Sequence, residues 1–133
     1  MLGTRSQASN NENINILLVE ADINDAVRDK SEILDNSFSN VSVRLMCDTT
    51  AALQYINGGH RAAGQENPNL LVLDEKLDEQ EAMQIARKAK ENPNTKILML
   101  CQLPAKTRSK SLIDGYLNKP LNSEELITAL EGA

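Results

Sequence analysis

Three charged side chains come directly after short apolar segments of this sequence. Glu20 and Asp74 each end an apolar run, and Lys119 follows the short Tyr116–Asn118 segment. Two carboxylates and a lysine gathered in one place could bind Mg²⁺, which prefers one or two carboxylates together with water and phosphate oxygens. The lysine would hold a phosphoryl group as a point charge, and an aspartate can accept that group as an acyl phosphate. These residue types therefore indicate phosphoryl chemistry, provided that the fold brings them together.

A single acid after a strand is often only the cap of the next helix, so neither carboxylate is distinctive alone. Charges after three separate strands are harder to explain in that way. Lys119 is also followed by Pro120, and a Lys-Pro pair after a strand is typical of a tight turn of defined geometry. The set is therefore a stronger signal than any one of its members.

The hydrophobic pattern supplies the elements that would position these side chains. It predicts strands at about 14–19, 41–47, 70–73, 97–100 and 116–117, with the second strand near an edge. It predicts helices at 25–36, from 48 or 49 to Gly58-Gly59, from about 83 to 92 and at 122–130, with a shorter one at 106–112. Short apolar strands joined by helices indicate an α/β domain with a parallel sheet and helices on both faces. The carboxyl ends of such strands share one edge, where function is concentrated.

Cap residues mark the ends of two of these helices. Asp22 or Asn24 can cap the first helix, and Asn122 with Glu125 has the spacing of a capping box at the start of the last one. The lone histidine, His60, lies in a polar, glycine-bearing connection and is expected to be an exposed loop residue.

The composition fits one domain that binds neither nucleic acid nor a membrane. The 133 residues carry a net charge of −5, which repels phosphate backbones, and their two tyrosines and one phenylalanine provide no platform for base stacking. No apolar run approaches the roughly 20 residues of a membrane span. Cys47 and Cys101 are not spaced as a metal or disulfide cluster, which favours reduced thiols and a cytoplasmic location. Residues 1–13 are expected to be a disordered leader or linker, and residues 14–133 the folded domain.

Four segments together resemble the receiver domain of bacterial response regulators, the proteins of two-component signalling. They are, in chain order, Ile14–Glu20, Pro68–Asp74, Ile97–Leu100 and Asp114–Leu121. The resemblance covers about residues 13–131, and its most specific parts are the end of the second segment and the Tyr-Leu-Asn-Lys-Pro run of the fourth. It implies a flavodoxin-like, doubly wound fold with five parallel strands in the order 2-1-3-4-5 and five helices.

The resemblance also implies roles for individual residues. Asp74 matches the phosphoacceptor, Glu20 the first position of the acidic pocket and Lys119 the lysine that senses the phosphoryl group. Asp74 and Glu20 are then the candidate Mg²⁺ ligands. Cys101 and Tyr116 match the two switch positions, which are a hydroxyl residue beside the phosphoryl group and an aromatic residue that changes rotamer.

Three departures from the family pattern affect this chemistry. Ala21 stands where the family has its principal metal-binding aspartate, so the Mg²⁺ site is expected to be weak or absent. Asp22 is a poor substitute, because the chain enters a helix there. Cys101 replaces a threonine or serine, and a thiol is a weak donor, so we expect it to act as a small buried hydrophobe. The chain between Cys101 and Lys119 is several residues short, which leaves little of the fourth helix.

These features predict an atypical receiver, or pseudo-receiver, that keeps the scaffold and Asp74 but has a damaged metal site and switch. The first hypothesis is a non-enzymatic, phosphorylation-independent interaction module that docks a histidine kinase, another receiver or an output domain. The alternative is a functional phosphoacceptor that a histidine kinase phosphorylates on Asp74. A flavin enzyme of the same fold is disfavoured, because the chain has no glycine-rich or hydroxyl-rich phosphate loop after Val19 and no tryptophan.

A further hypothesis concerns self-association. A shortened fourth helix would leave apolar surface exposed at Leu103, Leu112 and Ile113, and this surface would favour a homodimer.

Overall fold

The computed structural model describes residues 14–36, 40–58, 68–102 and 112–132. The elements in chain order are β1 (Ile14–Val19), α2 (Ile23–Asn36), β2 (Val41–Met46), α3 (Thr49–Ile56), β3 (Leu70–Asp74), α4 (Glu79–Ala89), β4 (Lys96–Cys101), β5 (Gly115–Asn118) and α5 (Ser123–Gly132). The predicted leader at 1–13, the loop with His60 and all but the last residue of the short helix at 106–112 lie outside the described residues. None of the helices in the described part is long and apolar enough to span a membrane.

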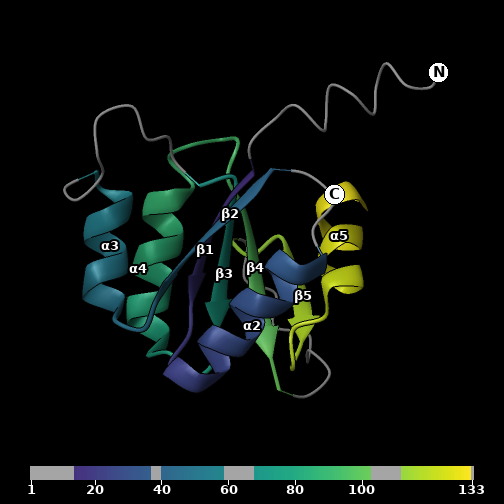
Figure 1. The fold of residues 1–133 in the computed structure, drawn as a ribbon. Helices are drawn as coiled ribbons and strands as arrows, with labels where there is room; N and C mark the ends of the chain where they lie inside the picture. The colour runs from purple at the N-terminus through teal and green to yellow at the C-terminus, as the bar shows by residue number, and fades with distance from the viewer. Residues whose placement is uncertain (1–13, 37–39, 59–67, 103–111, 133) are drawn as a thin grey trace.

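The strands form one parallel sheet in the order β2-β1-β3-β4-β5. Figure 1 shows α3 and α4 together on one side of this sheet and α2 and α5 on the other. This is the flavodoxin-like α/β architecture that the resemblance implies, and the strand order is confirmed. β2 lies at one edge of the sheet, as predicted, and β5 at the other.

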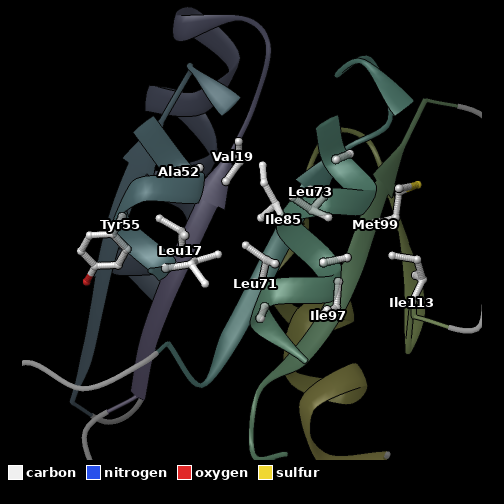
Figure 2. Close-up of a cluster of buried hydrophobic side chains, with 14 of the residues drawn as sticks. Leu17, Val19, Ala52, Tyr55, Leu71, Leu73, Ile85, Ile97, Met99 and Ile113 are labelled. Carbon is white, nitrogen blue, oxygen red and sulfur yellow. The ribbon is translucent and has the colours of Figure 1, made fainter. Parts of the chain in front are cut away.

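Alternate residues of each strand face opposite layers of helices. Leu71 and Leu73 point into the cluster under α3 and α4 that Figure 2 shows. Leu70 and Val72 belong to a second cluster, under α2 and α5. All of β3 is buried, so the carboxylate of Asp74, which continues the even-numbered series, reaches the end of the sheet from within the core.

The start of α2 differs from the prediction. The helix begins at Ile23 rather than Asp25. Asp22 is its cap, because Asp22 Oδ1 accepts hydrogen bonds from the N–H groups of Asn24 (2.8 Å) and Asp25 (3.1 Å). Ile23 is exposed, so this first turn lacks the inward-facing apolar residue from which the sequence pattern would predict a helix.

The predicted capping box of α5 forms only in part. Asn122 Oδ1 accepts from the N–H of Glu125 at 3.0 Å, as a cap should. The Glu125 carboxylate turns instead to Asn118, accepting from its backbone N–H at 3.1 Å and from its Nδ2 at 3.0 Å. This side chain therefore joins α5 to the end of β5.

The prediction that Leu112 and Ile113 expose apolar surface is wrong. Ile113 is 9% exposed and packs in the cluster under α3 and α4, and Leu112 is partly buried against the same cluster. The two residues shortly precede β5, so the strand positions their side chains against the core. Leu103, the third residue of that set, lies outside the described part of the chain.

Candidate functional site

The carboxyl edge of the sheet brings two of the three predicted charges into direct contact. Asp74 ends β3 and Lys119 follows β5, and Lys119 Nζ lies 2.5 Å from Asp74 Oδ1. Both side chains are buried, with exposures of 1% for Asp74 and 9% for Lys119. The backbone of Lys119 is fixed as well, because its N–H donates to Cys101 O at 2.7 Å and its bond to Pro120 is cis.

The Asp74 carboxylate accepts two further hydrogen bonds. The N–H of Ala21 donates to Oδ2 at 2.9 Å, and the N–H of Lys76 donates to Oδ1 at 3.0 Å. Burial alone would raise the pKa of Asp74, but the bonds from Lys119, Ala21 and Lys76 and the charge of Lys119 outweigh it, so the pKa lies below its ordinary value. Asp74 is therefore an ionised carboxylate with both oxygens engaged.

The third predicted charge, Glu20, lies in a different environment. Its side chain is fully buried, and neither of its oxygens receives a hydrogen bond from a donor in the described residues. It faces Asp29 of α2, which is 1% exposed and whose oxygens also lack such a donor. Arg28 Nε lies 3.5 Å from Asp29 Oδ1, but the Arg28 side chain is largely exposed, so water screens this ion pair.

Two carboxyl groups in contact can share a hydrogen bond only when one of them carries a proton. Burial is the largest reason why the pKa of Glu20 rises to about 9, and the contact with Asp29 and the charge of Asp74 raise it further. Glu20 is therefore protonated at neutral pH. Sequence reasoning missed Asp29, although its spacing from Ala26 and Ile33 places it on the inner face of α2.

The described residues do not fit a divalent cation. Ala21, where the resemblance expects the main metal ligand, contributes only its N–H, and Asp22 caps α2 with its Oδ1. Burial and its acidic neighbours raise the pKa of Glu20 to about 9, which disfavours the charged form that a cation needs, and both oxygens of Asp74 are engaged. No group of three or more acidic, histidine or cysteine side chains in the described part could hold a metal ion. A weak or absent Mg²⁺ site, inferred from Ala21, stays a prediction, and the donors described above support that prediction.

The two candidate switch residues lie on the other side of the sheet. Cys101 is 5% exposed, belongs to the cluster under α3 and α4, and places its Sγ 3.9 Å from Met99 O. Tyr116 is partly buried against the same cluster. Asp74 continues the series of β3 residues, Leu70 and Val72, that faces the opposite layer. The roles of Cys101 and Tyr116 in switching stay predictions.

Comparisons with known proteins identify the fold. No protein-family model matches the chain, and no curated protein sequence matches it. The structure of the bacteriophytochrome response regulator AtBRR is similar over 90% of this chain and 91% of that chain, with 23% identity and a TM-score of 0.73. A CheY-like response regulator receiver domain protein from Methanospirillum hungatei JF-1 is similar over 91% and 93%, with 22% identity and a TM-score of 0.66.

A third similar structure is the Mn(2+)-bound form of response regulator Rcp1, with 25% identity, 90% coverage of both chains and a TM-score of 0.63. The structural neighbours of the chain are thus CheY-like receiver domains of response regulators, and the chain shares their fold.

The raised pKa of Glu20 gives a prediction about stability. The folded pKa of Glu20 is about 9, against 4.5 for the free side chain, so the folded state binds more protons than the unfolded state between these values and loses stability as the pH rises. Glu20→Gln removes this loss, so its stability gain over wild type should grow from roughly pH 5 to roughly pH 8. Urea unfolding at several pH values measures it. The matched control is Glu124→Gln, at an exposed position of α5, and an equal pH dependence for wild type and Glu20→Gln would contradict the prediction.

The missing carboxylate at Ala21 gives a prediction about metal binding. Ala21→Asp adds an acidic ligand beside Asp74, so Mg²⁺ should bind at least about tenfold tighter than to wild type. An amide NMR titration with MgCl₂ measures both affinities. Asn24→Asp adds the same charge to the exposed first turn of α2 and should leave the affinity unchanged. If Ala21→Asp binds Mg²⁺ no better than wild type, the lost carboxylate is not what limits the site.

Proposed function

We propose that this chain is a receiver-like domain of two-component signalling that acts mainly as a phosphorylation-independent protein–protein interaction module. The observation that carries the proposal is the state of the acidic pocket. Glu20 is fully buried and its pKa is raised to about 9, Ala21 offers only an N–H, and both oxygens of Asp74 are already engaged. On this proposal the domain is not an enzyme, lies in the cytoplasm, and binds a histidine kinase, another receiver or an output domain.

The chemistry of phosphoryl transfer explains why the pocket matters. Enzymes that transfer phosphoryl groups use metal ions to neutralise charge on the transferring group, and protein groups alone supply positioning and hydrogen bonds. Here the cation that contacts Asp74 is the ammonium group of Lys119. The charge of Lys119 already balances that of Asp74 itself, so slow or absent phosphorylation is expected.

The outer face of α2 supports the interaction half of the proposal. Ile23, Val27 and Leu34 are exposed by 53%, 51% and 41%. Their spacing places them along one stripe of the helix, to one side of the inner face that packs on the sheet. Apolar side chains gathered on one face of a helix are the chemistry of a protein contact. We therefore place the docking surface on α2.

The alternative function, a working phosphoacceptor, has one specific observation in its favour. Asp74 is ionised and in direct contact with Lys119, and these are the nucleophile and the phosphate-binding cation that an aspartyl phosphate needs. A histidine kinase that supplies a well-positioned phosphoryl group could then use Asp74. The two functions differ in whether the pocket responds to a phosphoryl mimic.

Amide NMR spectra with Mg²⁺ and beryllofluoride, a mimic of the aspartyl phosphate, test the first half of the proposal. Wild type should show no change at Asp74, Gln102 or Lys119, because the pocket lacks a metal ligand and its donors are occupied. Asp74→Ala is the control for binding elsewhere. Large wild-type changes that disappear in Asp74→Ala would make the phosphoacceptor the better description.

Substitutions at the docking surface test the second half. The assay is surface plasmon resonance against purified histidine-kinase core domains of the same organism. It should find a partner whose affinities for wild type and for Asp74→Ala agree within about twofold, since the proposed contact does not use Asp74. Val27→Asp, in the centre of the apolar stripe, should weaken that partner at least about tenfold. Gln80→Asp, which adds the same charge at an exposed position of α4, is the matched control. Binding that needs Asp74 and tolerates Val27→Asp would contradict the proposal.

A further inference from the structure

Gln102 directly follows β4 and carries the first N–H group beyond the end of the β3–β4 ladder, where Asp74 lies. Leu100 is the partner of Asp74 in the register, and its carbonyl oxygen accepts from the N–H of Glu75 at 3.0 Å. The next residue, Cys101, turns its carbonyl to the other side, where it accepts from Lys119. Because successive residues of a strand alternate between its two neighbours, the N–H of Gln102 faces β3 again.

This N–H does not bond to the backbone of β3. It donates to Oε2 of Glu75 at 2.6 Å, so the side chain of the residue directly after Asp74 fills the place of the next ladder bond. A backbone N–H on a carboxylate at this distance is a charge-assisted hydrogen bond, which is stronger than a bond between neutral groups. Glu75 is half-buried, whereas Gln102 and the bond itself are exposed to water.

We propose that Glu75 is an internal anionic ligand of this edge, which closes the Asp74 pocket to tetrahedral oxyanions such as a phosphoryl group. The inference rests on the proposed function only for the class of ligand, and it adds a residue and a contact that the pocket argument does not use. The contact is autoinhibitory, because a carboxylate of the chain holds the donor that an oxyanion beside Asp74 would take.

The donors at this edge show why the contact matters. Ala21, Lys76 and Lys119 give their hydrogen bonds to Asp74, and Gln102 gives its backbone bond to Glu75. An oxyanion in such a pocket is stabilised by backbone N–H groups and a cation. Each of these four donors is held by a carboxylate of the chain itself.

The charges act in the same direction. Among the described side chains that make these bonds, Asp74 and Glu75 contribute two carboxylates and Lys119 one ammonium group. The net negative charge of this set repels an incoming dianion. Replacing Glu75 by a neutral residue therefore removes a competitor for the Gln102 N–H and a repulsive charge at once.

The test is a titration of the whole chain with inorganic phosphate, followed by amide NMR. Glu75→Ala should bind phosphate at least about tenfold tighter than wild type, with the largest shifts at Gln102 and Lys119. Glu75→Gln keeps the shape and an acceptor but loses the charge, and its affinity should fall between the two. Glu91→Ala is the matched control. It removes one carboxylate near the amino ends of the strands, where Glu91 pairs with Lys88.

Equal phosphate affinities for wild type and Glu75→Ala would overturn the inference, and so would the absence of binding by either protein. A purely structural role for Glu75 would lower the unfolding midpoint of Glu75→Ala without any gain in phosphate binding. If Glu75→Ala does not fold, Glu75→Gln decides, and an unchanged affinity in that variant overturns the inference. The proposed function fails separately, by a beryllofluoride response in the wild-type protein itself.

Discussion

The ionised carboxylate of Asp74 is almost fully buried, and the arrangement of the carboxyl edge follows from the need to stabilise that charge. An isolated buried carboxylate is very costly, and pairing it with a cation and hydrogen-bond donors offsets most of the cost. The cation comes from Lys119, so β5 must lie close beside β4. Gly115 permits this approach, because a Cβ at that position would lie 3.0 Å from Leu98 Cδ2.

The start of β5 is fixed by a second carboxylate, Asp114, which is partly exposed and lies at the other end of the strand. Asp114 Oδ2 accepts from the N–H of Ile97 at 2.8 Å and from Lys90 Nζ at 2.7 Å. Although burial acts to raise it, the pKa of Asp114 lies below its ordinary value because of these bonds. One carboxylate therefore anchors β5 at its beginning, and the other, Asp74, holds the lysine at its end. Glu20, which follows β1 at the carboxyl edge, is neutral instead, because burial and its acidic neighbours raise its pKa to about 9.

The sequence predicts the parts of this arrangement that depend on local pattern. The apolar runs give the strands, and the residues after them give Asp74, Glu20 and Lys119, while the strand order came only with the resemblance. Asp29 was missed because a charged residue in a helix is read as exposed unless its inner-face spacing is checked. The bond between Glu75 and Gln102 was missed for another reason. It joins residues 27 positions apart and depends on which side of β4 an N–H faces, which no single-sequence pattern reports.

α2 connects the two halves of the proposed function. Its inner face carries Ala26, Asp29 and Ile33, which are buried against the sheet, and its outer face carries the exposed stripe that includes Val27. The helix is one regular segment of 14 residues, so the packing of the inner face sets the position of the stripe. Asp74 takes its hydrogen bonds from Ala21, Lys76 and Lys119, none of which belongs to α2. A partner that binds the stripe would therefore meet the same surface whether or not Asp74 reacts, which is the physical basis for docking without phosphorylation.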